Sequence, residues 1–182
     1  MVFVPPPHPC CLPPDTLLKE CQVKHTRGSG PGGQHRNKVA TAVVIKHLPT
    51  KVSGQASESR SQKANMENAV IRLRVKLALS CRTQPEPPPD AQAEDGATYQ
   101  PSSLWKGRVK GGKLAINDKH VDFPAVLCEA LDCIWREQDV KAASEGLGIS
   151  TSQMVKLLAK EPVALQLVNG LRASGGLPPL RN

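Results

Sequence analysis

The stretch RTQPEPPPDAQAEDGATYQPSS, residues 82–103, limits the possible folds more than any other feature, because it interrupts the chain near its middle. Residues 83–103 hold four acidic residues, no basic residue and no apolar periodicity. This composition is typical of a linker rather than of a packed element. We therefore expect two small domains, residues 14–81 and 104–182, each with its own core. Residues 1–13, broken by prolines, predict a disordered lead.

The hydrophobic period of the first segment changes near Arg60. Upstream of it, alternating and β-branched residues predict strands over 21–27, 41–48 and 51–57. Downstream, apolar residues at i, i+4, i+7 and i+11 predict one face of a helix that ends near residue 79: Met66, Val70, Leu73 and Leu77. Basic residues fill much of the rest of that helix: Arg60, Lys63, Arg72, Arg74 and Lys76. One long helix on a small mixed sheet makes this an α+β domain.

The second segment carries one turn signal followed by helical signals. GRVKGGKLAIN predicts a hairpin that turns at Gly111-Gly112. Asp122 is expected to cap a helix, and DVKAASEGLGISTSQMVKLLAK predicts two helices joined at Gly148, with Ser150 and Gln153 at capping-box spacing. EPVALQLVNGLR predicts a last helix. The expected buried positions are Leu127, Leu131, Ile134, Leu165 and Val168. The result is a small helical domain resembling a helix-turn-helix.

The charge of +8, from 24 Lys/Arg and 16 Asp/Glu, is unevenly distributed. Residues 14–82 hold 13 Lys/Arg against 4 Asp/Glu, a net of +9, whereas residues 104–182 hold 11 against 8, a net of +3. A small basic domain most often binds a polyanion, which makes nucleic acid the leading partner. A solvated basic face is the simpler alternative.

The cysteines and the N-terminal sequence bear on metal binding and location. The six cysteines form no Cys-x-x-Cys pair, and no histidine lies at zinc-finger spacing from a cysteine pair. We therefore expect reduced thiols and no metal site. MVFVPPPHPCCLPP is too broken by proline to predict a secretory signal or a membrane span. The expected location is the cytoplasm.

The run RGSGPGGQHRNK, residues 27–38, places four glycines and one proline between two predicted strands. A segment with so few side chains can present one amide side chain, Gln34, on a positively charged base. The simpler alternatives are a flexible surface loop and a phosphate-binding loop. A phosphate-binding loop of the P-loop type would end in Gly-Lys-Ser/Thr, which Gln-His-Arg does not match.

Residues 15–80 resemble the catalytic domain of class I peptide chain release factors. Gly32-Gly33-Gln34 matches that family's tripeptide, and the likeness extends through GSGPGGQHRNK, TAVVIKHLPT and SESRSQKANMENA. The tripeptide alone would be a weak signal because glycine is common. Together with three flanking elements in the same order and spacing, it is specific. Nothing comparable covers residues 104–182.

The resemblance implies that Gly32, Gly33 and Gln34 are catalytic in hydrolysing the ester between peptide and tRNA. In the family the glutamine N–H stabilises the transition state and the leaving 3′-hydroxyl, while its side chain admits water and excludes other nucleophiles. No cofactor is implied. The residues expected to contact ribosomal RNA are Arg27, His35, Arg36, Asn37, Lys38, Lys46, Arg60 and Lys63. A general-base role for His35, and mere solvation of each basic residue, are the alternatives. His47 is expected to be a packing residue.

Departures from the family pattern bear on the substrate. Members that read stop codons carry a separate decoding domain, for which this sequence has no space and no identified tripeptide. The chain therefore resembles the short, codon-independent members that rescue stalled ribosomes, although LRASGGLPPLRN lacks their Lys/Arg-rich tail. The expected partners are the peptidyl-transferase centre of the large ribosomal subunit, peptidyl-tRNA, and a glutamine methyltransferase acting on Gln34. We expect a monomer that does not bind membranes.

The second domain supports a rival interpretation. AASEGLGISTSQMVKLL has the small-residue, glycine-turn, second-helix order of a DNA-reading helix-turn-helix. Its second helix, TSQMVKLLAK, offers few side chains for reading bases. Two non-enzymatic alternatives follow: a DNA-binding regulator that carries an inactive tripeptide domain, and a ribosome-binding protein that hydrolyses nothing.

Overall fold

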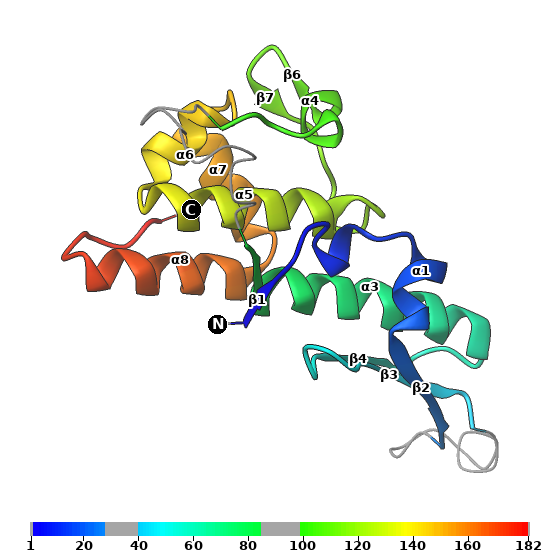
Figure 1. Cartoon of the computed structure of the whole chain (residues 1–182). Helices are drawn as coiled ribbons and strands as arrows, with labels where there is room; N and C mark the ends of the chain where they lie inside the picture. Colours follow the sequence, from blue (N-terminus) through cyan, green and yellow to red (C-terminus); the bar gives the residue numbers. More distant parts are fainter. Residues whose placement is uncertain (1, 28–39, 85–98, 182) are drawn as a thin grey trace, which may run out of the picture. The chain divides into compact units, whose positions relative to one another are not determined.

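Two units make up the chain, residues 1–81 and 82–182. The computed structural model describes residues 2–27, 40–84 and 99–181 (Figure 1). The first unit holds a three-stranded sheet and one long helix, and the second is mainly helical. This confirms the α+β class and the order of a sheet-containing domain before a helical one. Among the described helices, none has the length and apolar character needed to cross a membrane.

The sheet of the first unit contains β2 (Cys21–Thr26), β3 (Ala42–His47) and β4 (Ser53–Ala56), in that order. Both neighbouring pairs are antiparallel, so this sheet is not mixed as the sequence predicted. For β3 and β4 the physical reason is that the connection, residues 48–52, is too short for the crossover that a parallel pair requires.

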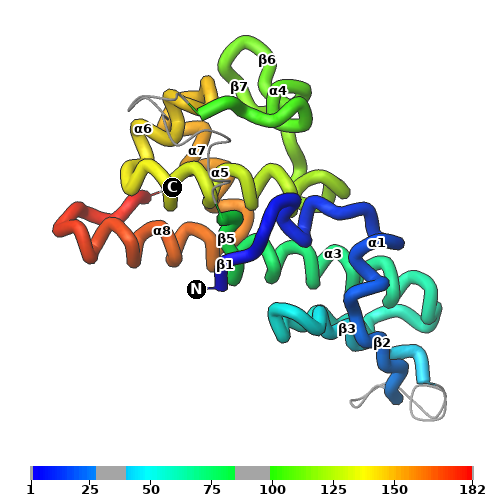
Figure 2. The backbone as a smooth tube through the Cα atoms, in the orientation of Figure 1, coloured from blue at the N-terminus to red at the C-terminus, as the bar shows by residue number. Residues whose placement is uncertain are grey.

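The long helix α3 (Gln62–Ser80) lies across one face of this sheet (Figures 1 and 2). Val70, Leu73 and Leu77 are buried on it, as their spacing predicted. The helix contacts β3 and comes especially close to β4, where Gly54 lies. A Cβ at Gly54 would lie 2.4 Å from the carbonyl oxygen of Ala69. Glycine is therefore required where the helix backbone touches the strand.

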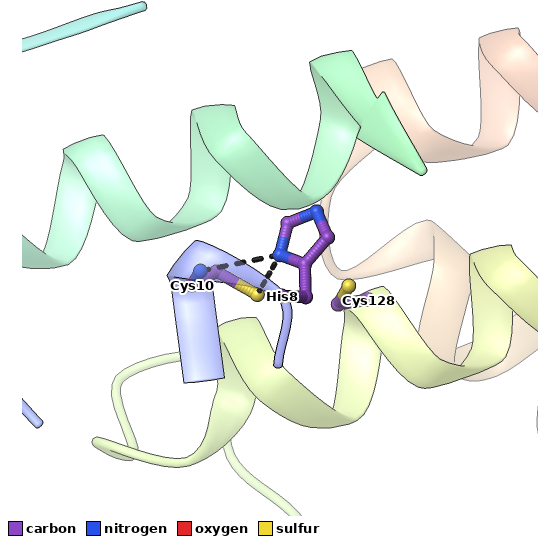
Figure 3. Close-up of side chains that lie close together, drawn as sticks. All are labelled: His8, Cys10 and Cys128. Carbon is purple, nitrogen blue, oxygen red and sulfur yellow. Dashed lines mark hydrogen bonds between the residues drawn. The ribbon is translucent and has the colours of Figure 1, made fainter. Parts of the chain in front are cut away.

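The N-terminal residues differ from the predicted disordered lead. They form β1 (Val2–Val4), a 3₁₀ helix η1 (Pro9–Cys11) and α1 (Pro14–Lys19). The Nδ1 atom of His8 accepts a hydrogen bond from the Cys10 amide at 3.1 Å (Figure 3), and Cys10 is fully buried. Arg74 on α3 donates through Nε to the Cys10 carbonyl at 2.7 Å.

Two features of the sequence explain this difference. Prolines set the turns of residues 1–13. The face of α3 that carries Arg74 then packs against η1 within this segment. Arg74 was expected among the basic residues that occupy the rest of the helix outside its apolar face, and it is buried.

The buried His47 fixes the turn that follows β3. Its Nδ1 lies 2.8 Å from the Thr50 hydroxyl, and its Nε2 lies 3.1 Å from the carboxylate of Glu20, just before β2. The imidazole is 1% exposed. His47 therefore joins two connections of the sheet and has the structural role that was expected of it.

The second unit is a set of packed helices with one small hairpin. Its elements are β5 (Cys81–Thr83, which begins in the first unit), α4 (Ser103–Arg108), β6 (Val109–Lys110), β7 (Lys113–Leu114), α5 (Phe123–Glu137), α6 (Val140–Gly146), α7 (Thr151–Ala159) and α8 (Pro162–Ser174). The hairpin turns at Gly111-Gly112 as predicted. Helix α4 was not predicted. It is held by the buried indole of Trp105, which donates to the Leu147 carbonyl at 2.8 Å.

The helix caps agree with the sequence at α7 but not at α5. Ser150 accepts from the Gln153 amide at 3.3 Å, as the capping-box spacing indicated. Asp122 precedes α5, yet its side chain makes no cap hydrogen bond and instead accepts from the Arg108 guanidinium. An ion pair with a neighbouring cation has displaced the weaker interaction with the helix amides.

Candidate functional site

The predicted catalytic segment connects two strand ends that lie side by side at the same end of the sheet. Thr26, the last residue of β2, is the cross-strand partner of Ala42, the first residue of β3. Residues 28–39 connect these paired ends. The predicted site residues Gly32, Gly33, Gln34, His35, Arg36, Asn37 and Lys38 lie outside the described residues. The base from which this segment leaves the sheet is fully described, and we call it the tip base: residues 25–27, 40–42 and 58–65.

Asn65 joins the two sides of the tip base. Its side-chain amide donates to the Thr41 carbonyl at 2.7 Å and to the Ser59 carbonyl at 2.8 Å. Its Oδ1 accepts from the Ser59 amide at 2.9 Å. The residue is fully buried. Because both side-chain groups are used, Asn65 fixes the return of the chain into β3 relative to the start of α3.

The start of α3 also contacts the other strand of the tip base. The Nε2 atom of Gln62 lies 2.8 Å from Nδ1 of His25 on β2. Ser61 caps the helix by accepting from the Ala64 amide at 3.3 Å. Both strand ends are therefore tied to the same helix turn. The sequence pattern did not predict this role for Asn65. Its position in SESRSQKANMENA, one of the stretches that carry the family resemblance, could have indicated it.

Three of the predicted RNA-binding residues gather at the tip base. Arg27 directly follows β2, and Arg60 and Lys63 flank Gln62 at the start of α3. All three are exposed. Lys46 lies apart from them, because it pairs with Gln22 and Ser53 toward the far end of β3. At roughly 3.3 Å per residue, the four positions from Ala42 to Lys46 correspond to about 13 Å.

Lys46 instead belongs to the sheet face opposite α3. Strand alternation places Lys24 on that same face, with Gln22 and Gln55 as exposed neighbours. Lys24 was not among the predicted site residues, although the alternation of CQVKHT was sufficient to find it. This open face, defined by Gln22, Lys24, Lys46 and Gln55, is a second basic surface of the first unit.

A polar hollow lies between the tip base and β4. It is lined by Thr26, Arg27, Ala42, Val43, Val44, Gln55, Ala56, Ser57, Glu58 and Arg72. The Arg72 guanidinium lies 2.6 Å from Glu58 and donates to the Gln55 carbonyl at 2.8 Å. The hydrogen bond from Arg72 lowers the pKa of the Glu58 carboxyl below its ordinary value. Because Glu58 is ionised and paired, it does not act as a proton donor here at neutral pH.

The helix-turn-helix of the second unit presents few side chains that could read DNA, in line with its sequence. Helices α6 and α7 are joined through Gly148, whose φ is +68°. On the candidate recognition helix, Ser152 and Lys156 are exposed. Lys160 directly follows it, and its ammonium donates to the Ile116 carbonyl at 2.8 Å, so it has a structural partner. Few side chains are left to read bases.

The fold and the tip base define an α+β domain in which the sequence Gly-Gly-Gln lies between the paired ends of two strands, β2 and β3. The family model described as RF-1 domain matches residues 16–108, just over half of the 182 residues. The chain therefore belongs to the RF-1 domain family, within the class I peptide chain release factor superfamily.

Several curated proteins are similar to parts of the chain. "Peptide chain release factor PrfB1, chloroplastic" of Arabidopsis thaliana is 46% identical over 66 residues, 36% of this chain and 14% of that protein. "Peptide chain release factor 1" of Xylella fastidiosa (strain 9a5c) is 48% identical over 58 residues, 32% of this chain and 16% of that protein. "Peptide chain release factor 1" of Streptococcus pneumoniae (strain Hungary19A-6) is 45% identical over 60 residues, 33% and 17% respectively. The chain thus spans well under a fifth of the length of these relatives.

Proposed function

We propose that this chain hydrolyses peptidyl-tRNA on the ribosome without reading a codon, and so releases peptides from stalled translation complexes. The observation that carries the proposal is the position of GSGPGGQHRNK, inserted between the paired ends of β2 and β3 in an RF-1 domain. The basic tip base and the open face supply positive charge on the same unit. A polyanionic partner suits both surfaces.

The chemistry is ester hydrolysis by water. The water oxygen bonds to the ester carbonyl carbon, the bond to the tRNA 3′-oxygen breaks, and that oxygen leaves with a proton as a hydroxyl. Gly32 and Gly33 let the backbone approach RNA closely, because they have no Cβ. The Gln34 amide is the proposed donor to the developing negative charge, and its side chain orients the water.

The proposed RNA contacts follow from exposure and charge. Arg27, Arg60 and Lys63 would meet phosphates near the tip base, and Lys46 would meet them through the open face. The polar residues His35, Arg36, Asn37 and Lys38 remain proposed contacts within the segment that carries the tripeptide. These contacts position the domain without reading sequence.

The test is release of labelled peptide from ribosomes stalled on a message that lacks a stop codon. We expect Gln34→Pro, which removes the backbone donor, to lower the release rate by about 10²–10³. Gln34→Ala keeps the donor and should lose less, while Gly33→Ala should bind but release very little. Gln166→Ala, at an exposed glutamine on α8, is the matched control. Equal release by wild type and all three tip variants would overturn the catalytic proposal.

Codon independence is tested separately from hydrolysis. Release is measured with a stop codon, a sense codon and no codon in the ribosomal A site. We expect release with the empty site and no gain from the stop codon. A strict requirement for a stop codon would contradict the rescue function and leave the hydrolytic one intact.

Gln34 is also the proposed target of a glutamine methyltransferase. Gly32 and Gly33, directly before Gln34, carry no side chain that would hinder an enzyme approaching the amide from that side. Mass spectrometry of the tryptic peptide from the natural host should show one added methyl group on Gln34. A wholly unmodified peptide would remove this partner from the proposal.

A further inference from the structure

The hairpin of the second unit and the residues beside it carry an excess of positive charge. Residues 106–119, here called the basic hairpin, hold five Lys/Arg and one Asp, a net of +4. Four of these cations are exposed lysines: Lys106, Lys110, Lys113 and Lys119. The structure records ion pairs elsewhere among the described residues, but none for these four lysines.

Two of the lysines are forced side by side at the turn. Lys110 and Lys113 are direct cross-strand partners in the β6–β7 pair. Gly111 and Gly112 between them have φ values of +55° and +70°, the two positive angles that a tight two-residue turn needs. Like charges placed directly opposite each other destabilise a hairpin. The hairpin therefore carries an electrostatic cost that a bound polyanion would relieve.

The base of the hairpin is held in place by the rest of the second unit. The Arg108 guanidinium donates to the Asp122 carboxylate and lies 3.2 Å from Nε2 of His120. The Ala115 amide donates to the Arg108 carbonyl at 2.9 Å, and Lys160 donates to the Ile116 carbonyl. In Figure 2 the turn points away from α5 and α8 of the same unit. The lysines are thus presented on a fixed frame, which lowers the ordering cost of binding.

We propose that the basic hairpin docks on the sugar–phosphate backbone of folded RNA, as a contact separate from the tip base. Lysines are point charges that match phosphates, and no exposed large hydrophobic residue lies between residues 105 and 119 to insert into a membrane. The partner is identified as ribosomal RNA because the proposal rests on the proposed ribosomal function. The hairpin then gives the second unit a role in recruiting the protein.

The test uses the full chain and purified large ribosomal subunits without peptidyl-tRNA, so that it is independent of hydrolysis. The variant Lys110→Gln/Lys113→Gln removes the opposed pair. We expect its affinity near 0.1 M salt to fall about tenfold or more. The slope of log affinity against log salt should become shallower by about two. The matched control is Lys141→Gln/Lys156→Gln, two exposed lysines on α6 and α7 of the same unit, which should leave the slope unchanged.

Further variants distinguish lost charge from lost structure. Lys110→Arg/Lys113→Arg keeps the charge and should bind as wild type. Lys113→Glu removes the repulsion, so its melting temperature should equal or exceed that of wild type while its binding falls. If the arginine variant binds no better than the glutamine variant, the charge explanation is overturned.

Other probes separate the possible partners. Tighter binding to anionic lipid vesicles or to duplex DNA than to ribosomal subunits would overturn RNA as the partner. A loss confined to the α6 and α7 control variant would move the docking surface to the helix-turn-helix. If release activity is absent but the hairpin variant still loses subunit binding, the docking proposal stands and the hydrolytic one fails.

Discussion

Gly54 shows how one residue sets the distance between helix and sheet. The position it occupies on β4 lies against the backbone of α3, and an added Cβ would meet the Ala69 oxygen at 2.4 Å and the Leu73 nitrogen at 2.5 Å. Those neighbours are main-chain atoms of a helix, so they cannot rotate away as a side chain would. The glycine therefore permits the close approach of β4 to the backbone of α3.

Gly54→Ala should be strongly destabilising for this reason. We expect a loss of about 3 kcal/mol or more, at the upper end of overpacking effects, measured by urea unfolding. The control is Gly170→Ala in α8, where an added Cβ meets nothing within 4 Å. That change should stabilise by roughly 0.5–1 kcal/mol, because alanine favours a helix interior. Equal effects of the two substitutions would contradict the packing argument.

Asn65 gives a second prediction at the residue scale. Asn65→Asp replaces the donor to the Thr41 and Ser59 carbonyls with an acceptor, which we expect to cost about 2–3 kcal/mol and to slow peptide release. The control is Asn68→Asp, an exposed residue of the same helix that gains the same charge. Unfolding midpoints and release rates are measured for both. If Asn65→Asp released peptide at the wild-type rate, Asn65 would not position the tip base.

Helix α6 is stabilised by a side-chain cap at its N-terminus, Asp139. The Asp139 carboxylate accepts from the Ala142 amide at 3.0 Å, and this hydrogen bond lowers its pKa below the ordinary 3.8. A carboxyl with a lowered pKa stabilises the fold above its ordinary pKa, and this contribution is lost as pH falls through the folded value. The cap is thus an acid-sensitive part of the second unit.

The acid dependence of this cap can be measured by comparing wild type with Asp139→Asn between pH 5 and pH 2. Asparagine is a comparable cap that does not titrate, so the variant should be similar to wild type at pH 5 and relatively more stable at pH 2. The difference should stay under about 1 kcal/mol because the group is partly exposed. Parallel pH curves would show that this cap contributes nothing to acid unfolding.

At the scale of the whole molecule, positive charge is gathered on separate surfaces of the two units. The first unit has the tip base and the open face, and the second has the basic hairpin. The overall +8 hides this arrangement, because the acidic residues 83–103 and the remaining acids offset part of it. Binding to a polyanion should therefore depend on which lysines are removed, and not on net charge alone.

The open face gives the corresponding prediction. We expect Lys24→Gln/Lys46→Gln to reduce the slope of log ribosome affinity against log salt by about two. Lys51→Gln/Lys76→Gln, which removes one exposed charge from the β3–β4 turn and one from α3 of the same unit, should reduce it far less. Salt-titrated co-sedimentation measures both. Identical slopes for the two double variants would show that binding responds only to total charge.

Local pattern predicted much of the fold and part of the site. Alternation found β2, β3 and β4, helical spacing found α3, and Gly111-Gly112 found the hairpin, because each depends on residues close together in the chain. The tripeptide and its flanking residues identified the family from sequence order alone. The disordered lead was predicted from proline content, which does not show that Cys10 meets Arg74 64 positions away.

The order of the elements, the glycine-rich segment and the excess of positive charge follow from the amino-acid sequence alone. Packing determines which residues far apart in the chain come together: Asn65 with Thr41, Arg108 with Asp122, and Arg74 with Cys10. The physical reason is that propensity and periodicity act within a few residues, whereas buried hydrogen bonds and ion pairs form between segments that packing has already brought into contact.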